Sequence, residues 1–124
     1  MKVVNCVVGS LLTLAAVPAN ASDWRLTGTS THGDKQYVDA STVVMGATTR
    51  KAWVREDLPE VSAQGLNRTK SRREFDCSER RYRVLSMTAF KDADVVATLN
   101  EATDWSDISP DSMDEAVLKT VCSL

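Results

Sequence analysis

The cysteine content restricts the fold of this 124-residue chain more than any other feature. Of its three cysteines, Cys6 lies in an apolar N-terminal segment, and Cys77 and Cys122 lie in the remainder. An even pair of cysteines in an exported chain predicts a structural disulfide, because the compartment outside the cytoplasm is oxidising. On the chain-entropy model, closing a loop of about 45 residues stabilises the fold by roughly 4 kcal/mol.

The same cysteines do not suit other roles. A structural zinc site needs about four ligands, whereas the chain beyond the N-terminal segment has two cysteines and one histidine, His32. A cysteine nucleophile needs a nearby base, and His32 lies in a polar stretch over residues 30–34. We therefore expect no metal site and no catalytic cysteine, with His32 in a solvated loop.

The N-terminal segment has the features of a secretory signal peptide. Lys2 precedes an apolar run over residues 3–17, and Ala-Asn-Ala occupies residues 19–21. This arrangement is typical of a signal peptide that is cleaved after its last alanine. The run of about 15 apolar residues is shorter than the ~20 that a membrane-spanning helix needs. We expect a signal peptide over residues 1–21, one domain over residues 22–124, and no transmembrane segment in the mature chain.

The expected localisation follows from the same segment. A lipoprotein signal places its cysteine at the cleavage site, whereas Cys6 lies near the start of the apolar run and Ser22 follows the expected cleavage site. We therefore expect an exported protein without a lipid anchor. A periplasmic location is favoured over secretion or display on the cell surface. The sequence leaves open whether the protein is a monomer or a homodimer.

The domain consists of short expected strands followed by one helix. Polar and apolar residues alternate with period two in several runs, which is the pattern of strands with one buried face. The runs span residues 23–28, 36–39, 43–45, 49–57, 69–76, 81–90 and 95–99. In the run over residues 81–90, both sets of alternate positions include apolar residues. This favours a central strand that is covered on both sides.

One helix is expected over residues 113–122. Ser112 and Glu115 have the spacing of a capping box, and an apolar stripe with helical spacing is expected to lie on the sheet. The stripe consists of Met113, Ala116, Val117, Thr120 and Val121. The predicted fold class is α+β: an antiparallel meander of about six strands with one C-terminal helix packed on it. One disulfide would tie the end of the helix to the turn at Cys77.

The chain lacks the sequence motifs of the common enzyme classes. It has no G-x-S-x-G sequence, phosphate-binding loop, dinucleotide-binding fingerprint or dense cluster of metal ligands. The adjacent carboxylates Glu56 and Asp57 lie in an expected strand, so they point to opposite faces and do not act together on one substrate. We therefore expect a non-enzymatic protein without catalytic residues, cofactor or metal.

Charge is distributed unevenly along the chain. Residues 50–83 include ten basic and six acidic residues, whereas residues 91–124 include two basic and eight acidic ones. If residues 69–76 and 81–90 form a hairpin, basic side chains gather on it. The candidate binding residues are Arg68, Lys70, Arg72, Arg73, Arg80, Arg81 and Arg83.

A basic sheet face can bind sulfated glycans, lipopolysaccharide phosphates or an acidic protein surface through charge-assisted contacts. The alternative is that these side chains keep an exposed sheet soluble and protect its edges from pairing. The formal net charge of −2 and the expected export argue against nucleic acid as a partner.

Several features of the C-terminal half recur together in a known family. A cysteine is followed by a basic-aromatic strand, then by a tryptophan, a Pro-x-Ser-x-x-Glu helix start and a final cysteine. These features are Cys77, Arg81, Tyr82, Arg83, Trp105, Pro110, Ser112, Glu115 and Cys122, with "YVDASTVV" and Trp53 upstream. In this pattern the chain resembles the surface-adhesin protein E-like domain family of bacteria, over roughly residues 24–122.

The resemblance implies an antiparallel sheet with one helix against it. It also implies a role in adhesion, with host extracellular-matrix proteins or envelope proteins as partners. The expected function is therefore an exported, non-enzymatic binding module. The alternative is a periplasmic accessory or stress-related protein with an endogenous envelope partner and no adhesion.

Overall fold

The computed structural model describes residue 9 and residues 21–124. The signal peptide expected over residues 1–21, together with Cys6, therefore lies outside the described residues except at positions 9 and 21. Within the described part of the chain, no helix is long and apolar enough to cross a membrane.

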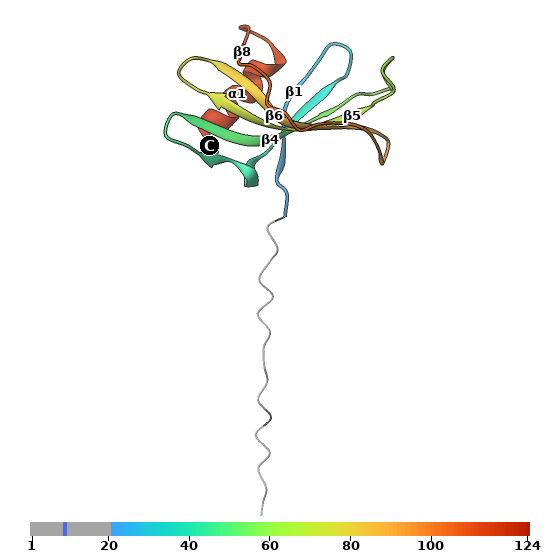
Figure 1. Ribbon diagram of the computed structural model, residues 1–124, viewed down its shortest axis with the longest axis horizontal. Helices are drawn as coiled ribbons and strands as arrows, with labels where there is room; N and C mark the ends of the chain where they lie inside the picture. The colour runs from blue at the N-terminus through green and yellow to red at the C-terminus, as the bar shows by residue number, and fades with distance from the viewer. Residues whose placement is uncertain (1–8, 10–20) are drawn as a thin grey trace, which may run out of the picture.

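An antiparallel sheet of eight strands forms the body of the fold (Figure 1). The strands are β1 (Trp24–Thr29), β2 (Lys35–Asp39), β3 (Val44–Met45), β4 (Thr49–Asp57), β5 (Arg68–Asp76), β6 (Arg81–Lys91), β7 (Asp94–Leu99) and β8 (Ser106–Asp107). A short 3-10 helix, Ala40–Thr42, follows β2, and the α-helix α1 spans Met113–Ser123.

The predicted meander with one C-terminal helix is confirmed. Six strands follow one another across the sheet in the order β1-β2-β4-β5-β6-β7. In addition, β3 pairs with β4 and β8 pairs with β6. The strand β8 has no counterpart among the expected runs, since two residues are too few to show an alternation of period two.

The sheet has two different faces, and the alternation of side chains along β5 shows which residues lie on each face. Ser71, Arg73 and Phe75 are buried on the side of α1, so Lys70 and Arg72 project from the other side. We call the side covered by α1 the helix face and the other side the open face. Directly paired residues of an antiparallel ladder share a face, so the register assigns the other strand residues as well.

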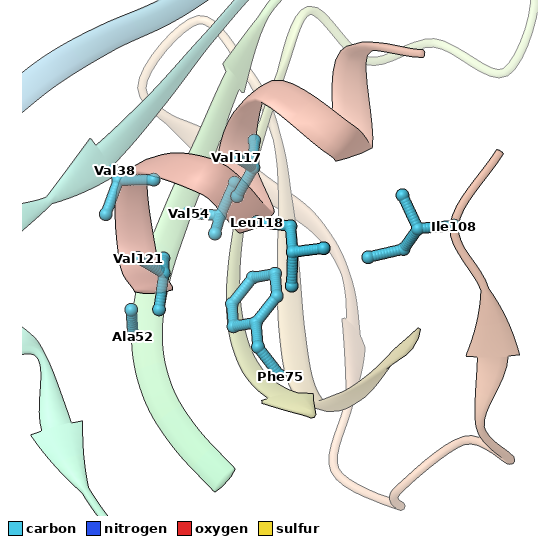
Figure 2. Packing of buried hydrophobic residues seen from close by; sticks show 8 residues of the cluster. All are labelled: Val38, Ala52, Val54, Phe75, Ile108, Val117, Leu118 and Val121. Atoms are coloured by element: carbon cyan, nitrogen blue, oxygen red, sulfur yellow. The ribbon is translucent and has the colours of Figure 1, made fainter. Parts of the chain in front are cut away.

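The hydrophobic core lies between the helix face and α1. Its buried residues are Val38, Ala52, Val54, Phe75, Ile108, Val117, Leu118 and Val121. Phe75 is fully buried, and Figure 2 shows its ring directed toward Leu118 of α1. The removal of these apolar side chains from water is the main force that holds the helix on the sheet.

The start of α1 follows the predicted capping box. The backbone N–H of Glu115 donates to Ser112 Oγ at 3.2 Å, and Glu115 Oε1 accepts from the backbone N–H of Asp111 at 3.3 Å. The predicted apolar stripe is only partly right. Val117 and Val121 are buried as expected, but Leu118 is buried in the core whereas the other predicted members are half-buried. Those half-buried members are Met113, Ala116 and Thr120.

The predicted disulfide is confirmed. Cys77, directly after β5, is bonded to Cys122 in the last turn of α1, with their Cα atoms 5.9 Å apart. A second contact holds the same end of the helix, since Arg50 Nη1 donates to the carbonyl oxygens of Val121 and Leu124 at 2.8 and 2.7 Å. The C-terminal turn of α1 is thus fixed both covalently and by hydrogen bonds.

The predicted central strand over residues 81–90 is confirmed, since β6 pairs with β5, β7 and β8, but its predicted cover on both sides is wrong. α1 packs on β1, β2, β4 and β5, and Figure 1 shows it on one side of the sheet. In β6 only Ala89 is buried, and its other members are half-buried or exposed. The helix is too short to cover every strand, because its 11 residues span only about 16 Å.

Candidate binding surface

Five of the seven candidate basic residues lie on the open face. They are Arg68, Lys70 and Arg72 on β5, followed by Arg83 and Arg81 on β6. We call these five residues the cation row. Each member lies two residues further along the sheet than the previous one, a step of about 7 Å, so the row is about 27 Å long.

The cation row passes from β5 to β6 at an irregularity in the ladder. Arg72 pairs with Ser86 and Arg73 with Val84, so β6 contributes one extra residue at this point. Beyond the irregularity, the open-face positions of β5 are acidic. Arg83 and Arg81 lie opposite Glu74 and Asp76 and supply the basic residues there.

Aromatic rings hold several of the open-face cations in place. Arg81 and Arg83 stack on Trp105, with their Cζ atoms 4.8 and 4.9 Å from the ring centroid. Lys70 Nζ lies 5.7 Å from the centroid of Phe90. These distances are within the ~6 Å range of cation–π attraction. Two strands and the segment that contains Trp105 therefore cooperate to orient the row.

A further arginine on the open face was not among the candidates. Arg55 of β4 lies opposite Lys70, and its Cζ is 5.0 Å from the centroid of Trp24 and 4.3 Å from that of Tyr37. The register of β1, β2 and β4 places these three side chains on one face, which the alternation within each strand does not decide by itself. Arg55 also lies outside residues 68–83, where the candidate basic residues are concentrated.

Acidic residues lie beneath the basic ones on this face. Arg83 Nη2 is 2.6 Å from Glu74 Oε1, and Arg81 Nη2 is 3.4 Å from Asp76 Oδ2. The side chains of Arg83 and Arg81 are 35% and 40% exposed, whereas those of Glu74 and Asp76 are each 10% exposed. Although each pair is formally neutral, the part that faces solvent is the guanidinium.

The middle of the cation row is not neutralised in this way. Arg68 at one end donates to both oxygens of Asp57, at 2.7 and 3.3 Å, and this contact raises the pKa of Arg68. Within residues 21–124, neither Lys70 nor Arg72 has a carboxylate at ion-pair distance. These two side chains are therefore the ones best placed to bind an external anion.

The buried carboxylates of the open face remain ionised. Burial by itself raises the pKa of Glu74, but hydrogen bonds from Thr49 and Arg83, with the charge of Arg83, hold it below the ordinary value of 4.5. The backbone N–H of Glu79 holds the pKa of Asp76 below its ordinary value of 3.8; the Ser78 hydroxyl and Arg81 assist. At neutral pH both carboxylates are therefore charged supports for the arginines above them.

These lowered pKa values predict acid sensitivity. A carboxylate whose pKa is lower in the folded state adds stability above its unfolded-state pKa, and that stability is lost as pH falls through the folded-state pKa. We expect the melting temperature to fall steeply below about pH 4 and the Glu74→Gln variant to show a flatter decline. Calorimetry across this range, with Glu60→Gln in an exposed loop as control, measures both. Parallel curves for Glu74→Gln and wild type would contradict the assignment.

The other two candidate basic residues lie off the open face and hold α1. Arg73 is buried on the helix face, where its Nε donates to Ser71 Oγ at 2.9 Å and its Nη1 donates to Asp114 Oδ1 at 3.1 Å. Arg80 lies in the turn before β6 and pairs with Glu115 of the capping box. Their role in this structure is to fix the start of the helix.

His32 and the two cysteines of the domain are not brought together with a cluster of carboxylates in the described residues. No group of three or more His, Cys, Asp or Glu side chains within them lies close enough to hold a metal ion. His32 is exposed in the loop before β2, as expected, beside a hollow that Pro59 and Val61 also line. Neither Cys77 nor Cys122 is a free thiol, because the two form the disulfide.

A family model described as surface-adhesin protein E matches residues 24–123. The match covers β1 to α1 and includes both cysteines of the disulfide. No curated protein matches the chain, and no solved structure does either.

Proposed function

Because this chain belongs to the surface-adhesin protein E family, we propose that it is an exported, non-enzymatic binding module of the cell envelope that holds its ligand on the open face. The observation that carries the proposal is the cation row, with five basic side chains on the one sheet face that α1 does not cover. Two of the five, Lys70 and Arg72, are not ion-paired within residues 21–124.

The pairing of charges supports this choice of face. At the start of α1, Arg73 and Arg80 are already paired with Asp114 and Glu115. Because Lys70 and Arg72 on the open face have no such carboxylate partner within residues 21–124, an acidic ligand is attracted to the open face.

Charge reversal tests the proposal. The double variant Lys70→Glu/Arg72→Glu is expected to bind an immobilised basement-membrane extract at least ~30-fold more weakly than wild type, since it inverts the two unpaired charges. Surface plasmon resonance measures the binding, and circular dichroism verifies the fold. The matched control is Lys91→Glu/Lys119→Glu, which makes the same change of net charge at two exposed positions off the cation row. Equal weakening of both variants would contradict a role of the open face.

The location of the protein separates adhesion from the alternative role. On intact cells that express a tagged chain, an adhesin is expected to be digested by added protease. Protection from protease together with release by osmotic shock would contradict surface display. The chain would then act as a periplasmic accessory protein, and its open face would bind an envelope component instead of a host one.

A further inference from the structure

The cation row is a line rather than a cluster, and its geometry narrows the class of ligand. Its five members follow one another at steps of about 7 Å over about 27 Å. Such a row matches a linear polyanion that lies along the strands. We propose that the ligand of the open face is a sulfated or otherwise strongly acidic polysaccharide, an inference that rests on the function proposed above.

The cations are arranged before any ligand binds. Stacking on Trp105 holds the guanidinium planes of Arg81 and Arg83, and the carboxylates beneath them occupy only part of their donor edges. A planar guanidinium with free N–H groups binds sulfate or carboxylate oxygens in a bidentate manner. Because these side chains are already ordered, binding an anion costs less conformational entropy.

Hydroxyl groups accompany the row on its neighbouring strand. Ser86 lies opposite Arg72, and Thr88 lies opposite Lys70. Thr98 of β7 extends the second of these lines to the sheet edge. Small hydroxyl side chains next to cations suit a ligand that carries hydroxyl groups between its charges, as a polysaccharide does.

The open face carries more charge than the core of a protein interface does. Such a core is enriched in aromatic residues, Met and Arg but depleted of Lys, Asp and Glu, whereas the cation row includes Lys70 and is paired with Asp57, Glu74 and Asp76. Here the exposed large apolar residues lie on β1, β3, β7 and in the loop between β4 and β5, not along the cation row. They are Leu26, Val44, Met45, Val61, Val95 and Val96.

Two other polyanions fit the same face less well. Single-stranded nucleic acid binds to sheets by stacking successive bases on open aromatic rings. The rings of Trp24, Tyr37 and Trp105 already have arginines over them, so among the tryptophans of this face Trp53, half-buried opposite Arg72, is the single open ring within the described residues. An anionic lipid surface favours apolar side chains next to the cations, and those lie at the margins. Both ligands are included in the test as outcomes that would overturn the proposal.

Size-defined heparin oligosaccharides are the probe, and isothermal titration calorimetry of the full mature chain is the measurement. We expect affinity to rise with oligosaccharide length until the chain spans about 27 Å and then to level off. The logarithm of the association constant is expected to fall linearly with the logarithm of the salt concentration. The expected slope is about −3 to −5, because three to five cations are neutralised. Desulfated heparin and neutral dextran are expected not to bind.

Two double variants test whether heparin binds at the cation row. Arg72→Gln/Arg83→Gln is expected to weaken heparin binding at least ~30-fold, while Lys91→Gln/Lys119→Gln is expected to change it less than about twofold. Equal affinity for heparin, a single-stranded oligonucleotide and anionic vesicles would overturn the proposal.

If wild type fails to bind heparin yet Lys70→Glu/Arg72→Glu still abolishes binding to the matrix extract, the polysaccharide inference is wrong and the proposed function stands. If that variant binds the extract normally, the proposed function itself fails.

Discussion

Replacing Cys77 and Cys122 together by serine is expected to lower the free energy of unfolding by about 4 kcal/mol. The disulfide closes a loop of 45 residues, and removing it restores that loop's freedom to the unfolded chain. A domain of this size has a total stability of about 5–15 kcal/mol, so the variant is expected to lose a large fraction of it. Urea denaturation followed by circular dichroism measures the change.

Chemical reduction provides the matched control for this variant. Wild-type protein in excess reductant is expected to unfold at the same urea concentration as the double serine variant, because both lack the same bond. The slope of the transition is expected to rise in both, since the unfolded chain becomes less compact. A loss below about 1 kcal/mol in both samples would show that the contacts of Arg50 and the core hold the helix end without the disulfide.

Phe75→Ala is the second substitution with a large expected effect. Phe75 is fully buried between the sheet and α1, and its ring faces Leu118 (Figure 2). Removing a buried phenylalanine ring leaves a cavity and costs about 3–5 kcal/mol. The midpoint of urea denaturation is expected to fall accordingly, with α1 losing its contact to β5.

Phe90→Ala is the control on the opposite face. Phe90 lies at the far end of the same strand pair, on the open face, and is only half-buried with Lys70 over its ring. Its loss is expected to cost less than half as much stability as that of Phe75, because less apolar surface returns to water. Equal losses at the two positions would contradict the division into a helix face and an open face.

Local patterns in the sequence were sufficient to predict much of the fold. The alternation in β4 places Ala52 and Val54 on one face, and both are buried there. The capping box at Ser112 depends on residues three apart. The disulfide follows from the cysteine count and the expected export. Each of these predictions depends on few residues and on a short-range or covalent rule.

The errors concern features that only tertiary packing decides. The spacing alone predicts Thr120 rather than Leu118 in the helical stripe, because several stripes are compatible with it and the sheet beneath selects one. Whether β6 is covered on both sides depends on where α1 lies across the sheet. That position follows from the contact of Phe75 with α1 and from the disulfide to Cys122, and both involve residues more than 20 positions after the end of β6.

The two arginines at positions 72 and 73 illustrate the same limit for the binding surface. Alternation requires that they point to opposite faces, but it does not say which one is buried. Arg73 is the buried one because Asp114, 41 residues away, accepts its hydrogen bond. The ladder irregularity beside this pair places Arg83 and Arg81 in the cation row, and no local pattern predicts it.

Heteronuclear NMR of the arginine Nε–H groups tests the central claim most directly, because it reports on each guanidinium separately. On titration with a short heparin oligosaccharide, the Nε–H resonances of Arg72, Arg81 and Arg83 are expected to shift in a saturable manner. Those of Arg73 and Arg80, which hold α1, are expected to stay within experimental error. Shifts confined to Arg73 and Arg80, or no saturable shift at any arginine of the cation row, would contradict the claim that the open face binds a polyanionic ligand.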